Sequence, residues 1–141
     1  MPTQQYDERF VAPMRAELTQ IGFTELRTPE AVDHELTTSK GTQLVVVNSI
    51  CGCAARNARP AVRIALENPR RPEHLATVFA GQDTDATERA RGYFVGYPPS
   101  SPSIGLLKDG QLVFMLERWQ IEGRPAQEIA HDLVNAFNTH C

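Results

Sequence analysis

Residues 44–61 read LVVVNSICGCAARNARPA, and this stretch predicts a buried strand that runs directly into a helix. Leu44–Val47 is a short β-branched run bounded by polar residues, which is typical of a strand covered on both faces, as in a parallel sheet. From Cys53 the chain becomes alanine-rich and helical until about Asn68, and Pro60 should bend this helix. The cysteines therefore lie at the carboxyl edge of the predicted sheet, between a strand and a helix.

The next segment of the chain repeats the order of strand and helix. Ala76–Ala80 predicts a second strand, and a helix capped by Asp83 or Thr84 should follow it through Tyr93. The segment GYPPSSP at 96–102 holds three prolines, which cannot donate the hydrogen bonds of a sheet, so it predicts a loop. Because crossovers between strands in one sheet are right-handed, we expect the first strands to be parallel.

A hairpin and a helix should close the chain. SIGLLK (103–108) and QLVFML (111–116) flank Asp109-Gly110, the dipeptide that most strongly indicates a two-residue hairpin turn. Apolar residues at helical spacing predict a last helix after Gly123. The fold class is therefore α/β, with a central mixed sheet that includes a C-terminal β-hairpin and is flanked by helices.

Two helices are predicted upstream of the buried strand. The first forms an N-terminal helical extension over about residues 4–22, and Pro13 either kinks or starts it. Residues 28–30, Thr-Pro-Glu, begin the second helix, because an N-cap, a first-turn proline and an early acid occur in that order. Residues 23–26 form a candidate short edge strand. The apolar side of the first helix is expected to comprise Phe10, Val11, Met14, Leu18 and Ile21.

Length and composition fit a single domain, residues 1–141, that buries roughly two-thirds of its unfolded surface. The formal net charge is −3, and no block of like charges occurs, which argues against a nucleic-acid-binding protein. The longest structural apolar run is far shorter than the about 18 residues that a membrane span needs. Asp7 and Glu8 lie where a secretory signal would have its apolar core. We therefore expect a cytoplasmic protein that does not bind a membrane.

The cysteines suggest redox chemistry. Three cysteines cannot form a disulfide framework, and Cys51 and Cys53 are only one residue apart. A helix N-terminus favours the thiolate, which is the form that attacks disulfides. We assign Cys51 as the nucleophile and Cys53 as the resolving thiol, since this position exposes one sulfur and shelters the other. A disulfide across Gly52 would close a strained ring that should be easily reduced, and glycine best adopts the backbone angles of such a ring.

Other interpretations of these residues remain open at this point. The two cysteines could simply pack beneath the start of a helix. Together with His140 and Cys141 they could instead form a thiolate-rich zinc or copper(I) site, although the spacing is unlike the usual zinc motifs.

Three arginines recur at helical spacing beyond the cysteines, at positions 56, 59 and 63. This spacing predicts a solvated helix face. An alternative is that Arg56 or Arg59 steers an anionic thiol substrate toward the cysteines.

A redox cysteine pair after a buried strand, with Ser101-Pro102 just before a hairpin, resembles the thioredoxin superfamily. In that superfamily a cis-proline opens the strand that faces the active-site cysteines, and Pro102 matches it. A second proline bends the cysteine-bearing helix, and Pro60 matches that position. The resemblance implies a thioredoxin-like fold in which Gly52, Ser101 and Pro102 contact the substrate.

A more specific resemblance is to the bacilliredoxin family, whose members carry a Cys-Gly-Cys motif on a thioredoxin-like fold. The family resemblance implies a thiol-disulfide oxidoreductase that removes bacillithiol from mixed disulfides on cytosolic bacterial proteins. Some members are described as weak disulfide isomerases, which remains an alternative function. The resemblance covers essentially the whole chain, and it is carried by VVVNSICGCAARNARPA (45–61), TVFAGQDTDAT (77–87), PPSSPS (98–103), Ile121-Glu122-Gly123 and the His140-Cys141 terminus.

The same resemblance implies that Cys51 attacks the mixed disulfide and that Cys53 is the resolving thiol. The expected partners are thiol-modified client proteins and a low-molecular-weight thiol, with bacillithiol as co-substrate and no bound cofactor or metal. Cys141 could act as an auxiliary thiol if the C-terminal tail folds back; otherwise it is an exposed bystander.

Overall fold

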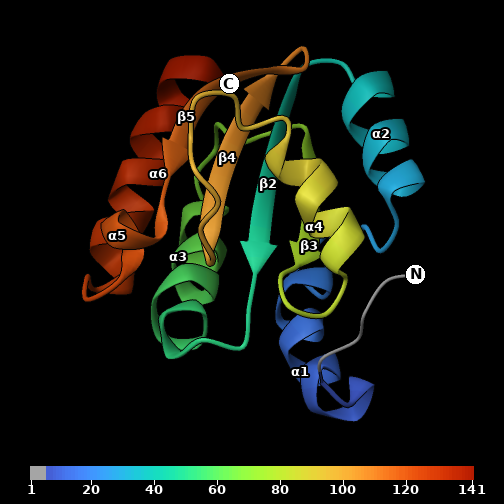
Figure 1. Cartoon of the computed structure of the whole chain (residues 1–141). Helices are drawn as coiled ribbons and strands as arrows, with labels where there is room; N and C mark the ends of the chain where they lie inside the picture. The colour runs from blue at the N-terminus through green and yellow to red at the C-terminus, as the bar shows by residue number, and fades with distance from the viewer. Residues whose placement is uncertain (1–5) are drawn as a thin grey trace.

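A five-stranded mixed sheet forms the centre of the protein in the computed structural model, which describes residues 6–141 (Figure 1). The strands are β1 (Thr24–Glu25), β2 (Thr42–Asn48), β3 (His74–Phe79), β4 (Ser103–Lys108) and β5 (Gln111–Leu116). Their order across the sheet is β1-β3-β2-β4-β5. β1, β3 and β2 are parallel to one another, β4 is antiparallel to β2, and β5 is antiparallel to β4. The predicted α/β class, the mixed sheet and the C-terminal hairpin are confirmed.

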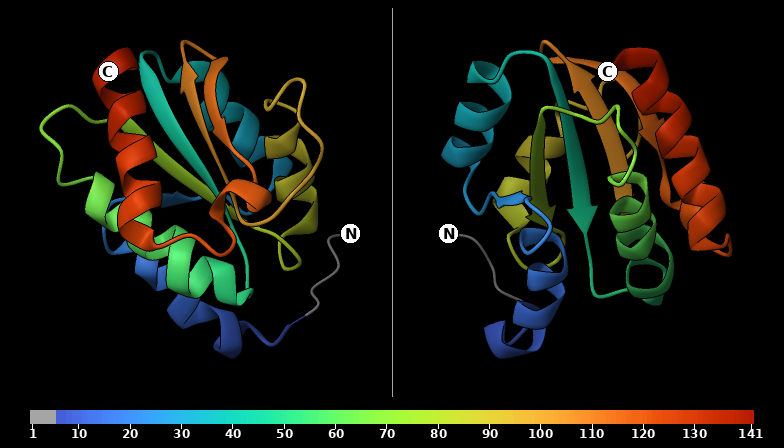
Figure 2. Two further views of the ribbon diagram at one scale, coloured as in Figure 1. Left: turned by 90° about the vertical axis from the view of Figure 1, so that its left-hand side faces the viewer. Right: turned by 180° about the vertical axis from the view of Figure 1, so that it is seen from behind.

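Helices cover both faces of this sheet (Figure 2). One face packs against α3 and α6, and the other packs against α2 and α4. The helices are α1 (Glu8–Thr19), α2 (Pro29–Thr38), α3 (Arg59–Ala65), α4 (Thr84–Arg91), α5 (Arg118–Ile121) and α6 (Ala126–His140), and a π-helical turn, η1 (Ala54–Ala58), leads into α3. None of the helices within residues 6–141 is long and apolar enough to cross a membrane.

β2 is the most deeply buried strand, as its β-branched sequence predicts. Leu44 and Val46 belong to the core beneath α3 and α6, whereas Val45 and Val47 belong to the core beneath α2 and α4. Successive side chains of a strand point to opposite faces, so four consecutive apolar residues serve two cores. The central position of β2 brings its carboxyl end, and the cysteines that follow, to the middle of one sheet edge.

The N-terminal helix forms as predicted, but it ends at Thr19 rather than near residue 22, and one of its apolar side chains is exposed. α1 forms with Pro13 inside it, and residues 4 and 5 of the predicted extension lie outside the described part of the chain. Val11 and Leu18 are buried, but Phe10 is 54% exposed, so its assignment to the buried side of the helix was wrong. Phe10 instead lies beside the Tyr6 ring, with 6.3 Å between the ring centroids.

Local signals set several other boundaries. The Thr28 hydroxyl accepts a hydrogen bond from the Ala31 N–H at the start of α2, as its N-cap position requires. Asp109 and Gly110 both have positive φ, which the hairpin turn between β4 and β5 demands. Asp83 precedes α4, but its side chain makes no capping bond and instead lies 2.7 Å from the guanidinium of Arg15.

Candidate active site

The Cys-Gly-Cys motif lies where β2 gives way to a helix, below the arrowhead of β2 in Figure 1. The Cys51 N–H donates to Ser49 Oγ at 3.2 Å, and the Cys51 carbonyl accepts hydrogen bonds from the N–H groups of Ala54 and Ala55. The backbone of Cys51 is thus fixed on both sides. Its side chain is partly exposed, whereas Cys53 is buried, with only 8% of its surface accessible.

The two sulfurs differ in their tendency to ionise. Partial burial of Cys51 opposes ionisation, but hydrogen bonds from the Cys53 thiol and N–H, together with the charge of Arg118, outweigh burial and lower the pKa of Cys51. The Cys53 nitrogen lies 3.4 Å from the Cys51 sulfur. Burial, and then the proximity of Cys51, raises the pKa of the Cys53 thiol. Cys51 is therefore the sulfur that ionises first and that solvent can reach.

A cleft of about 380 Å³ opens beside Cys51, and we call it the Cys51 cleft. It forms where several separate segments of the chain meet at the carboxyl edge of the sheet. Its lining comprises Tyr6, Ser49, Ile50, Cys51, Ala80, Gly81, Arg91, Ser101 and Arg118.

Of the three residues predicted to contact the substrate, Ser101 lines the Cys51 cleft, whereas Pro102 and Gly52 do not. The Ser101–Pro102 peptide bond is cis, as the resemblance to thioredoxins implies. Ser101 lines the Cys51 cleft, while Pro102 is buried and does not line it.

Gly52 also lies outside the lining and does not have a positive φ in this structure, in which the cysteines are free. The reduced backbone therefore does not require glycine at this position, and a Cβ there would meet only the flexible end of Arg56, at 2.6 Å.

The prediction that Arg59 lies on a solvated face was wrong, and its side chain is not free for the alternative role of steering a substrate. Its side chain is only 3% exposed, and its Nη1 donates to Asn48 Oδ1 at 2.9 Å and to the Ser49 carbonyl at 3.0 Å. Its Nε lies 3.1 Å from a carboxylate oxygen of Glu17, on α1. Arg59 thus stabilises the turn that leads to Cys51, whereas Arg56 and Arg63 are exposed as expected.

Two arginines that the sequence did not single out do line the cleft. Arg91 is the last residue of α4, and Arg118 begins the four-residue helix α5. Arg118 Nη1 donates to the Ser101 carbonyl at 3.3 Å, and Arg91 Nη2 donates to the Ser100 carbonyl at 3.3 Å. No spacing along the chain connects these arginines with the cysteines, because they meet only through the folding of the 96–102 loop.

The four residues of the alternative metal site are not brought together. α6 carries His140 and Cys141 to the opposite end of the sheet, where the C-terminus lies near the top of Figure 1. Cys141 is half-buried and packs against the core beneath α3 and α6, so it is neither a fully exposed bystander nor a neighbour of Cys51. Within residues 6–141, no group of three or more His, Cys, Asp or Glu side chains is arranged to hold a metal ion.

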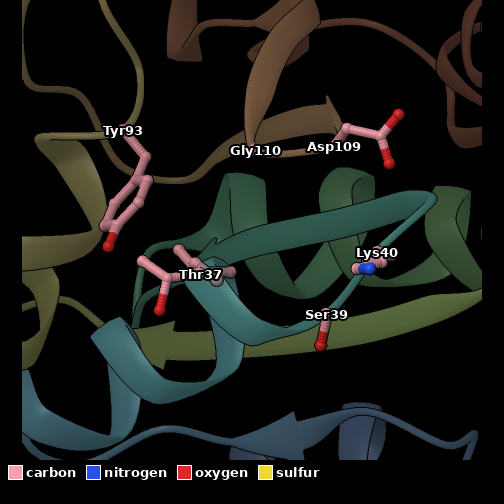
Figure 3. Close-up of a pocket in the computed structure, with 7 residues that line it drawn as sticks. Thr37, Ser39, Lys40, Tyr93, Asp109 and Gly110 are labelled. Atoms are coloured by element: carbon pink, nitrogen blue, oxygen red, sulfur yellow. The ribbon is translucent and has the colours of Figure 1, made fainter.

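A larger cavity, of about 510 Å³, lies at that opposite end of the sheet (Figure 3). It contains no cysteine or histidine. The Asp109 carboxylate beside it accepts a hydrogen bond from the Gly41 N–H at 2.8 Å, so this acid is used by the hairpin turn. The lining comprises Leu36, Thr37, Ser39, Lys40, Tyr93, Asp109 and Gly110.

Comparison with solved structures identifies the fold. The structure of Fasciola hepatica thioredoxin matches 84% of this chain and 100% of its own, with a TM-score of 0.59 and 22% sequence identity. A putative oxidoreductase with a thioredoxin fold matches 72% of this chain and 88% of its own, with a TM-score of 0.60. The predicted thioredoxin-like fold is confirmed.

Comparison of sequences identifies the family. A family model described as disulphide isomerase matches residues 6–141. A bacilliredoxin of Cytophaga hutchinsonii is 56% identical over 133 residues, which cover 94% of this chain and 98% of the relative. A bacilliredoxin of Koribacter versatilis is 54% identical over 136 residues, which cover 96% and 94% respectively. Together with the Cys-Gly-Cys pair on a thioredoxin fold, these matches place the chain in the bacilliredoxin family of thiol-disulfide oxidoreductases.

Proposed function

We propose that this oxidoreductase removes bacillithiol from mixed disulfides on cytoplasmic bacterial proteins. The observation that carries the proposal is the asymmetry of the cysteine pair: Cys51 is accessible and has a lowered pKa, while Cys53 is buried and has a raised pKa. The names of the bacterial relatives support bacillithiol as the thiol that is exchanged.

The reaction begins when the Cys51 thiolate attacks the bacillithiol sulfur of a modified protein. The Cys51–bacillithiol disulfide forms, the original disulfide breaks, and the client protein leaves as a thiolate that takes up a proton. Cys53 then loses its proton and attacks Cys51, which releases bacillithiol and closes the Cys51–Cys53 disulfide. Alternatively, a second bacillithiol attacks the same intermediate and restores the Cys51 thiolate, leaving bacillithiol disulfide.

The raised pKa of Cys53 influences the choice between these two routes. A buried thiol that ionises reluctantly is a slow second nucleophile, and a disulfide across one residue departs from relaxed geometry. Both effects favour release by a second bacillithiol molecule. Thiolates and leaving groups suffice for every step, so the proposal needs bacillithiol as co-substrate and no bound cofactor.

Disulfide isomerisation is the second candidate function, and the description of the matching family model favours it. An isomerase would use the same first attack by Cys51. It would differ in the second step, where a thiol of the client itself would attack Cys51 and form a new protein disulfide.

The test compares two adducts of one client protein, carrying bacillithiol or glutathione on the same cysteine. We expect the reduced protein to remove bacillithiol faster, the Cys53→Ser variant to be recovered with bacillithiol attached to Cys51, and the Cys51→Ser variant to be inert. Intact-protein mass spectrometry would follow all three. Equal removal of both adducts would contradict the bacillithiol assignment, and capture of the adduct on Cys53 would reverse the assigned roles.

A further inference from the structure

Two arginines line the Cys51 cleft although the chain as a whole carries a formal net charge of −3. Arg118 is paired with Glu122, which lies 3.2 Å away outside the lining. The lining includes two guanidinium groups, from Arg91 and Arg118, and no aspartate or glutamate. The only group in the lining that can supply a negative charge near neutral pH is the Cys51 thiol. The lining thus differs in charge from the chain as a whole.

Within residues 6–141, Arg91 has no counter-ion, whereas the two buried arginines, Arg15 and Arg59, are each paired with a carboxylate. Arg15 lies within 2.9 Å of carboxylate oxygens of Glu8, Glu25 and Asp83, and Arg59 is paired with Glu17. Arg91, by contrast, is half-buried and has no carboxylate within 4.0 Å among residues 6–141. Its Nε is buried without a hydrogen-bond partner in the same part of the chain.

Partial burial of the Arg91 guanidinium without a counter-ion is energetically unfavourable unless a ligand supplies the negative charge. A partly buried cation without a counter-ion gives up hydration and gains no ion pair in return. The effect is visible in Arg91, where burial lowers the pKa of the guanidinium. The two arginines are nevertheless held in place, since they donate to the successive carbonyls of Ser100 and Ser101.

We infer that Arg91, with Arg118 beside it, binds a carboxylate of the low-molecular-weight thiol half of the mixed disulfide, and so determines which thiols Cys51 removes. This inference rests on the proposed thiol exchange at Cys51 and adds a substrate class to it: small thiols that carry a carboxylate. A guanidinium donates two parallel hydrogen bonds to a carboxylate, which gives orientation as well as affinity.

The dimensions of the cleft favour a small molecule over a protein segment. Its volume of about 380 Å³ is near the lower end of the range for small-molecule sites, about 300–1,000 Å³. Cys51 lines the cleft and is partly exposed, so a thiol bonded to its sulfur would extend into the cleft. The client protein would remain outside.

The test uses three small aliphatic disulfides of similar size: 3,3′-dithiodipropionate, 2-hydroxyethyl disulfide and cystamine, which are anionic, neutral and cationic. The rate constant for their first reaction with Cys51 is measured by acid quench and mass spectrometry. In Arg91→Gln we expect the rate with dithiodipropionate to fall about tenfold, since a neutral amide replaces the paired, charge-assisted hydrogen bonds of the guanidinium. The rate with 2-hydroxyethyl disulfide should change less than about twofold, and Arg91→Lys should recover part of the anionic rate.

Arg63→Gln is the matched control, because Arg63 is exposed on α3 and does not line the cleft. It should leave the ratio of anionic to neutral rates unchanged. An equal effect of Arg91→Gln on all three disulfides, or no effect, would overturn the inference. A larger dependence on Arg91 for a glutamate-containing peptide disulfide than for dithiodipropionate would also overturn it, in favour of a client segment. Failure of Cys51 in the unmodified protein to react with any of the three would instead count against the proposed function.

Discussion

A cavity lies near each end of β2, and the two cavities differ in volume and in the chemistry of the side chains that line them. The cavity near the start of β2 is the larger, about 510 Å³ against about 380 Å³, but its acid serves the hairpin turn and it contains no thiol. The cleft near its end brings a thiol of lowered pKa together with an arginine that has no counter-ion within the described chain. The chemistry of the lining side chains, rather than the volume of the cavity, therefore identifies the candidate active site.

The largest expected difference between the two ends concerns their cysteines. Cys51→Ser should lower the rate of thiol exchange by more than about 10³-fold, because a serine hydroxyl does not ionise near neutral pH and cannot replace the nucleophile. Cys141→Ser, at the far end of the sheet, should retain the full rate. Release of a coloured thiol from a small aromatic disulfide measures both variants. A comparable loss in Cys141→Ser would show that the distant end takes part in the reaction.

Glu25, a buried acid near the end of the sheet that carries Cys51, should make the free energy of unfolding depend on pH. Burial raises the pKa of Glu25 to about 7, although Arg15 lies 2.9 Å away, because Asp83 adds a repelling negative charge. The folded protein therefore binds this proton more tightly than the unfolded chain, and stability falls as pH rises from about 4.5 to about 7. Glu25→Gln should reduce this loss by an amount of the order of 1–3 kcal/mol.

Urea unfolding of both proteins at pH 5.5 and pH 8 measures that effect. The difference between variant and parent isolates Glu25, since the same other groups titrate in both. Identical pH dependence of the two proteins would mean that Glu25 is already ionised at pH 5.5.

A smaller effect is expected from the charge beside the nucleophile. Arg118→Gln should raise the pKa of Cys51, because the arginine's charge stabilises the thiolate, and should slow alkylation near pH 7 roughly threefold. The difference should vanish at a pH where the thiol is fully ionised in both proteins. A uniform slowing at every pH would point to altered access rather than altered ionisation.

The smallest effect should come from the larger cavity. Lys40→Ala changes its lining at the far end of β2, so the exchange rate should stay within about twofold of the parent. Stopped-flow assay with the same aromatic disulfide provides the measurement. A tenfold change would undermine the functional contrast between the two ends.

Much of the fold could be predicted because its signals are local. The β-branched run of β2, the Asp109-Gly110 turn and the Thr28-Pro29 helix start each depend on a few adjacent residues. The position of the cysteines at the carboxyl end of β2 followed from these elements. Among the apolar residues expected on the buried side of α1, Phe10 is exposed, because α1 buries a narrower side than its apolar residues suggest.

The charges of the site could not be predicted, because they depend on contacts between distant segments. Arg59 was expected on a solvated face, but its partner Glu17 is 42 residues earlier in the chain. Arg91 and Arg118 reach the cleft from an α-helix end and from a four-residue helix too short to show periodicity. The loop of residues 96–102 brings both arginines to the cleft, and the prolines of this segment predicted only that it is a loop.

The most direct test of the roles assigned to Cys51 and Cys53 is the pH profile of alkylation at each cysteine of the reduced protein. Iodoacetamide is applied over a range of pH, and mass-spectrometric fragmentation assigns each adduct to Cys51 or Cys53. We expect Cys51 to react first, with a pKa below that of an ordinary thiol, and Cys53 to react slowly, with a pKa above it. Faster alkylation of Cys53, or an ordinary profile at Cys51, would contradict the assigned roles.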